Sequence, residues 1–269
     1  MGLDLVERSP TRFAAQGDAW ATLLIANAMA VKQTFYHPFA RFLAANGIHV
    51  TTFDYAIPDT EVTVTDWIEK DLAAMLAHAR AQAPDLPLLY VGHSLGGQLI
   101  GVTPGNDAIR AALHVTAGSG YYKFNDRMPL LVRMLWFVYM PLFTPLFGYF
   151  PGKALRAVGD LPRGVTRQWR EWCLKRDYLL DGNDEFRARY ARFTAPILSI
   201  SFEDDDINTK PGIDHLHSSY PNVTRRHVHP REAGQQRIGH FGFFNERCRE
   251  PLWSDALAWL RKAACAKPL

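Results

Sequence analysis

The sequence of 269 residues has only three cysteines and no basic arm or stripe. Cys173, Cys248 and Cys265 are widely spaced and form no C-x-x-C pair, so the sequence predicts neither a disulfide framework nor a cysteine zinc site. The 30 basic and 27 acidic residues are interspersed, which argues against a nucleic-acid-binding surface. The first residues include acidic side chains and no apolar stretch, so we find no secretory signal and expect a cytoplasmic protein.

Internal repeats and low-complexity segments are also absent, and only one long apolar stretch occurs, between residues 128 and 150. About 20 apolar residues can span a bilayer. Arg133, Pro141, Pro145 and Gly148 interrupt this stretch, and two closely spaced prolines break a helix that lipid requires to be continuous. We therefore expect no stable membrane span.

Most of the chain alternates short apolar runs with amphipathic patterns, as in repeated units of a strand followed by a helix. Strands are predicted over residues 21–26, 49–55, 86–92, 112–117, 196–202 and 223–228. Several of these runs are typical of parallel strands buried on both faces. Helices are predicted before the stop signal Asn46-Gly47, over residues 67–82, and over residues 255–264 with Ser254 as the cap.

The alternation fails between residues 121 and 193, where the proline-rich sequence LWFVYMPLFTPLFGYFPG precedes the charged helical pattern TRQWREWCLKRDY. We expect a core domain of residues 1–120 and 194–269 with a helical cap, residues 121–193, inserted into it. The cap contains an unusual number of aromatic side chains, which favours a pocket for an apolar or aromatic group. They include Trp136, Phe137, Tyr139, Phe143, Phe147, Tyr149 and Phe150.

The sequence Gly92-His93-Ser94-Leu95-Gly96-Gly97 lies between a predicted buried strand and a helix-compatible segment. A G-x-S-x-G sequence in this context is typical of a sharp turn that projects the serine hydroxyl, and the glycines remove Cβ atoms that would clash there. Ser94 is therefore the candidate nucleophile. The adjacent His93 is expected to point away from the site.

A serine hydroxyl needs a base within hydrogen-bond reach and a third group to orient that base. After such a turn the partners follow in the order acid, then histidine. His240 lies between glycines in a loop before the last predicted helix, and we expect it to be the base. For the acid we choose Asp205, with Asp204 as the second candidate in the acidic run 203–206.

With these residues in order, the chain resembles the α/β-hydrolase superfamily, particularly bacterial hydrolases near the serine aminopeptidase-like and lysophospholipase-like enzymes. The matching stretches are GHSLGGQL, FYHPFARFLAANGIHVTTFDY, PILSISFEDDD and IGHFGFF. The resemblance implies a mostly parallel, eight-stranded sheet flanked by helices, with the acid on Asp205.

The resemblance also implies an oxyanion hole made of two backbone N–H groups. Leu95 supplies one, and the loop Asn27-Ala28-Met29-Ala30 supplies the other, at Met29 with Ala28 as the alternative. Many relatives have a His-Gly pair where this chain has Asn27-Ala28. A second departure is FDYAIPDT, which lacks the arginine and glycines of the usual FDYRGIGxS, so the substrate is harder to infer.

Together these features predict a serine hydrolase that cleaves a small carboxylic ester or thioester through an acyl-enzyme. No cofactor, metal or nucleic-acid partner is implied. An acyltransferase or cyclase would use the same acyl-enzyme, and an amidase or peptidase the same residues. A binding protein on this scaffold is a further alternative, which the set of Ser94, Asp205 and His240 disfavours.

Overall fold

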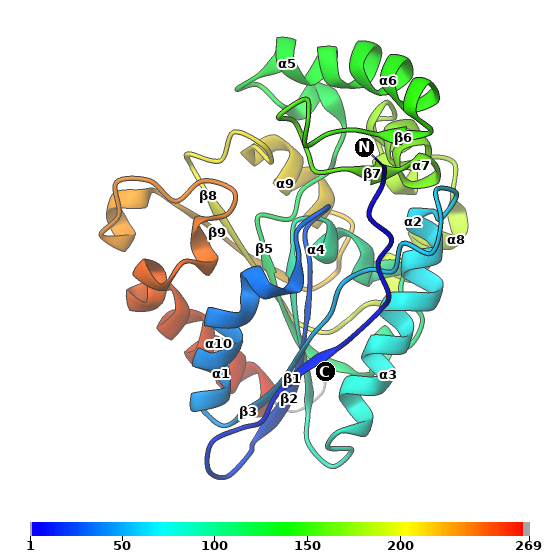
Figure 1. Cartoon of the computed structure of the whole chain (residues 1–269). Coiled ribbons are helices and arrows are strands. Elements are labelled where there is room, and N and C mark those ends of the chain that lie inside the picture. Colours follow the sequence, from blue (N-terminus) through cyan, green and yellow to red (C-terminus); the bar gives the residue numbers. More distant parts are fainter. Residues whose placement is uncertain (1, 266–269) are drawn as a thin grey trace.

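The computed structural model describes residues 2–265, in which a seven-stranded sheet lies between two layers of helices (Figure 1). The strand order is β1-β3-β2-β4-β5-β8-β9, and only the edge strand β1 runs antiparallel to its neighbour. The strands are β1 (Thr11–Phe13), β2 (Ala21–Ala26), β3 (Ile48–Thr52), β4 (Leu88–His93), β5 (Ile109–Val115), β8 (Ile197–Phe202) and β9 (Val223–Val228).

This mostly parallel sheet confirms the predicted fold class. Two predicted strands, 21–26 and 223–228, coincide with β2 and β9, and the others differ by a few residues at their ends. The predicted number of eight strands is wrong, because the described residues form seven in this sheet. The segment before β1 is largely exposed and contributes only an isolated bridge between Val6 and Ile57, so it adds no eighth strand.

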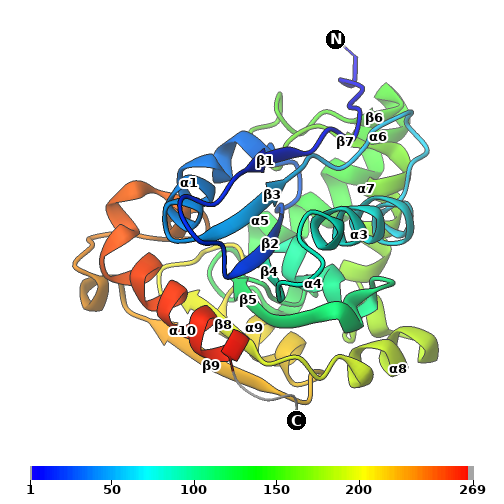
Figure 2. The same ribbon diagram turned by 90° about the horizontal axis from the view of Figure 1, so that it is seen from below.

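Helices cover both faces of the sheet, as Figure 2 shows from below. They are α1 (His37–Ala45), α2 (Val64–Asp66), α3 (Ala73–Ala81), α4 (Leu95–Leu99), α8 (Asp184–Arg192), α9 (Lys210–His217) and α10 (Ser254–Cys265). A π-helical turn, Trp67–Leu72, joins α2 to α3. Side chains of α1 and α10 pack on one face, and those of α3, α8 and α9 pack on the other.

Local sequence explains where several helices begin and end. The stop after α1 is confirmed, because Gly47 has a φ of 81°, in the left-handed region that favours glycine. The helix from Val64 begins with a capping box, in which Thr63 and Asp66 each accept a hydrogen bond from the backbone N–H of the other. The prediction that Ser254 caps the last helix is wrong. Ser254 is its first residue, because helical turns already occupy residues 249–253.

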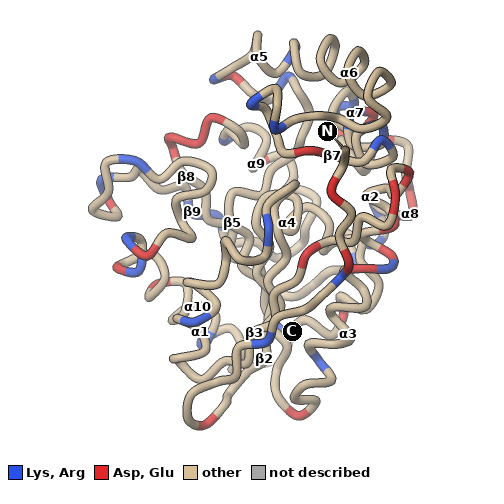
Figure 3. The backbone as a smooth tube through the Cα atoms, viewed as in Figure 1, with Lys and Arg blue, Asp and Glu red and all other residues tan. Residues whose placement is uncertain are grey.

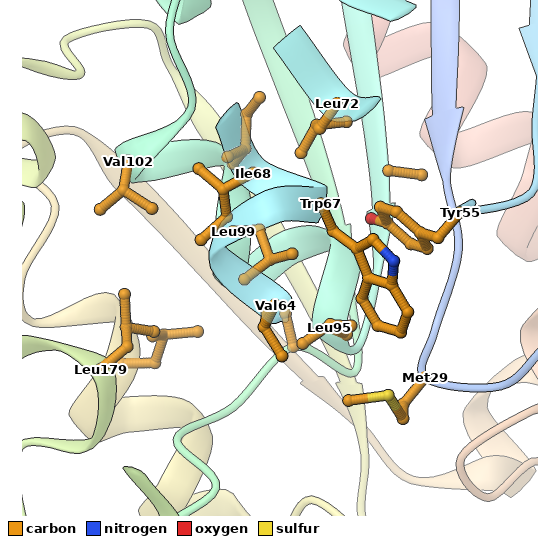
Figure 4. Close-up of a cluster of buried hydrophobic side chains, with 14 of the residues drawn as sticks. Met29, Tyr55, Val64, Trp67, Ile68, Leu72, Leu95, Leu99, Val102 and Leu179 are labelled. Carbon is orange, nitrogen blue, oxygen red and sulfur yellow. The ribbon is translucent and has the colours of Figure 1, made fainter. Parts of the chain in front are cut away.

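Two hydrophobic clusters form the core, one on each face of the sheet. β2 shows how one strand serves both, since Leu23 and Ile25 belong to one cluster and Leu24 and Ala26 to the other. This alternation explains why the central strands β2, β4 and β5 are almost wholly buried, whereas the edge strand β9 is largely exposed. Figure 4 shows part of the cluster on the α3 face, where side chains of the β2–α1 loop, the helix from Val64 and α4 meet.

The segment of residues 121–193 contributes no strand to this sheet. Its elements are α5 (Pro129–Met134), α6 (Met140–Phe147), the two-stranded pair β6 (Tyr149–Phe150) and β7 (Leu161–Pro162), α7 (Arg163–Cys173) and α8. In Figure 1, α5 and α6 form the uppermost part of the molecule, above α4.

A single helix of 19 residues runs from Pro129 to Phe147 and is long and apolar enough to cross a membrane by length and composition alone. The expectation that the prolines break this helix is wrong. Pro141 and Pro145 are both exposed, and π-helical turns directly precede Pro141, so the helix continues through both prolines.

Candidate active site

Ser94 occupies the sharp turn between β4 and α4. Its backbone has φ 49° and ψ −110°, a strained conformation for a residue with a side chain, and the residue is half-buried. The turn lies very close to neighbouring backbone. A Cβ added at Gly92 would lie 2.5 Å from the amide nitrogen of Gly97. A Cβ added at Gly96 would lie 2.4 Å from the carbonyl oxygen of Ala26. Glycine is therefore required on both sides of Ser94.

The structure brings His240 and Asp205 together across the carboxyl edge of the sheet. Nδ1 of His240 lies 2.8 Å from Oδ2 of Asp205, and the two side chains are 4% and 0% exposed. The other carboxylate oxygen of Asp205 accepts hydrogen bonds from the N–H groups of Ile207 and Asn208. These bonds hold the carboxylate in one orientation, in which it fixes the histidine ring with the proton on Nδ1.

The three neighbouring aspartates have different contacts. Asp204 accepts hydrogen bonds from the backbone N–H groups of Ile238 and Gly239, so it holds the loop that carries His240. Asp206 is partly exposed and lies 3.7 Å from Arg237. Asp205 alone of the three is hydrogen-bonded to His240 in the described structure.

Ser94 lies near this pair without a hydrogen bond between its Oγ and His240 in the described residues. Its Oγ is instead 3.5 Å from Nδ2 of Asn208, whose backbone N–H donates to Asp205. Nδ2 of Asn208 also donates to the carbonyl oxygen of Thr116. Asn208 thus links the serine to the acid, and it was not identified from the sequence.

A buried chain of hydrogen bonds joins three further segments behind the site. The N–H of Ala28 donates to the Tyr36 hydroxyl, which lies 2.8 Å from Nδ1 of His93. Nε2 of His93 lies 3.0 Å from the carbonyl oxygen of His240, which also accepts from the Thr116 hydroxyl. Burial lowers the pKa of His93 well below its usual value, and the neighbouring His240 lowers it further.

This chain of contacts fits one tautomer of a neutral His93. Because a carbonyl oxygen only accepts, Nε2 of His93 carries the proton, and Nδ1 accepts from the Tyr36 hydroxyl. His93 was expected to point away from the site, and the structure places its buried ring 5.2 Å from the ring of His240. No signal in the sequence indicated that His93 connects Tyr36 to the loop of His240, since these residues are far apart in the chain.

The two amides predicted for the oxyanion hole lie in adjoining loops. The N–H of Gly96 donates to the carbonyl oxygen of Asn27, which ties the turn after Ser94 to the loop after β2. The N–H of Ala28 is committed to Tyr36, whereas the N–H groups of Met29 and Leu95 have no acceptor among residues 2–265. Figure 4 shows the side chains of Met29 and Leu95 close together beside Trp67.

The aromatic side chains of the segment 121–193 do not all face inward. Trp136 and Phe150 are buried, whereas Phe137 and Phe147 are about half exposed. Part of the predicted aromatic cluster therefore packs inside and part lies on the surface. Within the part of the chain that the structure describes, no group of three or more histidine, cysteine or acidic side chains could hold a metal ion.

No protein-family model matches the sequence, and a search of curated proteins finds no match. Solved structures do resemble it. A soluble variant of a monoglyceride lipase from Saccharomyces cerevisiae has a TM-score of 0.72 at 15% identity, with 99% of this chain and 95% of that chain covered. A monoacylglycerol lipase from Paleococcus ferrophilus has a TM-score of 0.63 at 13% identity, with 96% and 100% covered.

A third similar structure is the ferulic acid complex of Est1E from Butyrivibrio proteoclasticus. Its TM-score is 0.65 at 12% identity, with 97% of this chain and 96% of that chain covered. These likenesses extend over nearly the whole of each chain. The protein therefore has the α/β-hydrolase fold, as the sequence predicted.

Proposed function

We propose that the protein is a serine hydrolase that cleaves a carboxylic ester or thioester with an apolar or aromatic group. The observation that carries this proposal is the buried His240–Asp205 pair, 2.8 Å apart, at the edge of the sheet where Ser94 occupies its strained turn. The fold itself hosts many chemistries, so the proposal depends on these side chains rather than on the fold. The similar structures named as lipases and as Est1E are consistent with it.

In the proposed reaction, Ser94 Oγ attacks the carbonyl carbon of the ester while Nε2 of His240 takes its proton. Asp205 stabilises the resulting imidazolium through Nδ1. The N–H groups of Met29 and Leu95 stabilise the negative oxygen of the tetrahedral intermediate. His240 then returns the proton to the departing alcohol or thiol, which leaves an acyl group on Ser94.

Water completes the cycle by the same route. His240 removes a proton from water as it attacks the acyl-enzyme, and then returns that proton to Ser94 as the acid leaves. The mechanism requires Ser94 Oγ to turn from Asn208 toward Nε2 of His240 when substrate binds. Catalytic hydrogen bonds are often long or misaligned before a substrate is present and shorten in the complex.

We further propose that residues 121–193 act as a lid domain over the core of residues 1–120 and 194–269. Buried contacts connect this lid to α4, since the hydroxyl of Tyr178 donates to the Gln98 side chain at 2.9 Å. Asn125 donates to the carbonyl oxygens of Asp206 and Ile207, in the loop that carries Asp205. A change in the position of Asn125 would therefore alter the hydrogen bonds of the loop that carries Asp205.

The test is hydrolysis of p-nitrophenyl esters of increasing acyl length by purified protein, compared with the matching anilides. We expect turnover of the esters and loss of about 10⁴-fold or more in kcat for Ser94→Ala. The exposed serine at the end of α9 gives the control Ser218→Ala, which should behave as wild type. Unchanged turnover in Ser94→Ala would refute the mechanism. Faster turnover of the anilides would make the protein an amidase.

A further inference from the structure

The helix from Pro129 to Phe147 exposes a large apolar surface. Only 17% of its most apolar stretch is buried. Residues 131, 138, 142 and 146 recur at helical spacing along the outward side. The exposed apolar side chains are Leu130 (72%), Leu131 (53%), Phe137 (49%), Val138 (39%), Leu142 (56%), Leu146 (68%) and Phe147 (52%). Contiguous exposed apolar surface of this kind marks an interaction site.

Basic side chains surround this apolar surface. The exposed basic residues between positions 121 and 170 are Lys123, Arg127, Arg133, Lys153, Arg156, Arg163 and Arg167, and the exposed acidic residue is Asp126. In Figure 3 the coils of α5 and α6 are largely tan, and blue segments lie next to them. Lys153 and Arg163 are paired with the acidic residues Asp4, Asp160 and Glu61, whereas the other five form no ion pair in the described structure. Basic side chains therefore outnumber acidic ones at this end of the molecule.

A groove between α6 and α7 brings three arginines together. Its volume is about 310 Å³, and α7 lines it with Arg163, Thr166, Arg167 and Arg170, whereas α6 lines it with Met140, Pro141, Thr144 and Pro145. These arginines are four and three residues apart on α7, which places them on one face of the helix, where like charges repel. An anion in the groove would relieve that repulsion.

The polar groups of this groove have unused hydrogen-bonding capacity. Arg163 uses Nε for Glu61, and Arg170 uses Nε for the carbonyl oxygen of Trp136, so their terminal nitrogens stay available. Arg167 makes no hydrogen bond or ion pair among residues 2–265. The Thr144 hydroxyl is buried, with the residue 6% exposed, and has no hydrogen-bond partner in the described structure. A phosphate oxygen would satisfy it.

We propose that this end of the molecule docks on a bilayer that contains anionic phospholipids. The outward side of the helix enters the boundary between headgroups and acyl chains, and the groove receives a phosphate headgroup. The helix lies in the plane of the bilayer and does not cross it. Its inner side packs on α7 through the edge-to-face contact of Trp136 with Trp169, and its two prolines lack the backbone N–H groups that a helix surrounded by hydrocarbon needs.

Docking goes beyond the proposed hydrolysis and does not depend on it. The surface lies above α4, so a docked molecule presents the lid end of the active site to the lipid (Figure 1). Binding is therefore measured on Ser94→Ala as well as on wild type. We expect wild type and Ser94→Ala to bind equally, because docking does not require catalysis. A failure to bind vesicles can then be distinguished from a failure to hydrolyse esters.

The experiment is co-sedimentation with vesicles of phosphatidylcholine alone and of three parts phosphatidylcholine to one part phosphatidylglycerol. We expect binding to the mixed vesicles, weaker binding in high salt, and little binding to phosphatidylcholine alone. The double variant Leu142→Ser/Leu146→Ser should bind about tenfold more weakly or worse. Arg167→Gln should bind about fivefold more weakly, since each basic residue near an anionic surface contributes about 1 kcal/mol.

Two arginine controls test whether position matters. Arg192→Gln removes an exposed arginine at the end of α8, and Arg80→Gln removes an exposed arginine on α3, away from α5 and α6 (Figure 1). Both should bind as wild type, and all variants should keep the wild-type melting temperature. Docking is refuted if wild type does not sediment with the mixed vesicles, or if the controls lose as much binding as the test variants. Stabilisation by inorganic phosphate through Arg167 without vesicle binding would instead show a site for a free anion.

Discussion

Two buried tyrosines give a sharp test of the hydrogen-bond chain behind the active site. The Tyr36 hydroxyl accepts from the N–H of Ala28 and donates to His93, and all three residues are buried. The Tyr55 hydroxyl is also buried but has no hydrogen-bond partner in the described structure. Replacing each tyrosine by phenylalanine removes one oxygen, so the two variants differ mainly in what the lost hydroxyl bonded.

Tyr36→Phe leaves two buried polar groups unpaired, and each costs about 1–3 kcal/mol. We therefore expect a loss of roughly 2–4 kcal/mol in the free energy of unfolding. Tyr55→Phe removes a hydroxyl that gains nothing from burial, so stability should stay the same or rise. The activity of Tyr36→Phe should also fall, by about tenfold, because the Ala28 N–H no longer anchors the loop that carries Met29.

The assay is urea denaturation of wild type and both variants at neutral pH, followed by kcat on one ester substrate. Similar stability losses for the two variants would refute the reasoning, because the structure assigns hydrogen bonds to only one hydroxyl. A stable Tyr36→Phe with reduced kcat would still support a positioning role for this hydroxyl. A stable and fully active Tyr36→Phe would refute that role too.

Three further predictions concern other parts of the molecule. Gly96→Ala places a Cβ 2.4 Å from the Ala26 carbonyl oxygen, so it should lower the melting temperature and abolish ester hydrolysis, and wild-type values would contradict the close approach. Asp205→Asn should lower kcat about 10⁴-fold, whereas Asp206→Asn should leave it unchanged; the reverse result would reassign the acid. Burial lowers the pKa of His217 from 6.5 to about 4, although its hydrogen bond to a carbonyl opposes the shift. Between pH 6.5 and 4, this histidine therefore binds a proton in the unfolded chain but not in the folded one. About 2 kcal/mol of the free energy of unfolding should be lost by pH 5. Urea denaturation of His217→Gln against wild type from pH 8 to 5 checks this, and identical pH dependence would contradict it.

Local patterns were sufficient for much of the fold. The segments 21–26 and 223–228 gave β2 and β9 without error, although only the first is an apolar run, and Asn46-Gly47 marked the end of α1. The residue types around Ser94 predicted a tight turn, and the structure shows that Gly92 and Gly96 lie too close to neighbouring backbone for a Cβ. Each of these features depends on interactions between residues close together in the sequence, or on the composition of a single strand.

Features that depend on distant segments could not be predicted from local patterns. Asp205 was chosen through the family resemblance, because the partner of His240 depends on how the backbone turns after β8, which orients three adjacent carboxylates differently. The link from Tyr36 through His93 joins segments far apart in the chain. Pro145 was expected to break its helix, but the helix continues through it to Phe147 and the residue is exposed beside the groove with α7.

The most direct test of the central claim is mass spectrometry of the intact protein after reaction with a fluorophosphonate probe, which labels only activated serines. We expect one adduct per chain, located by peptide mapping on Ser94, and loss of that adduct in both Ser94→Ala and His240→Ala. An adduct on another residue, or no adduct on folded wild type, would contradict the assignment of Ser94 as the nucleophile.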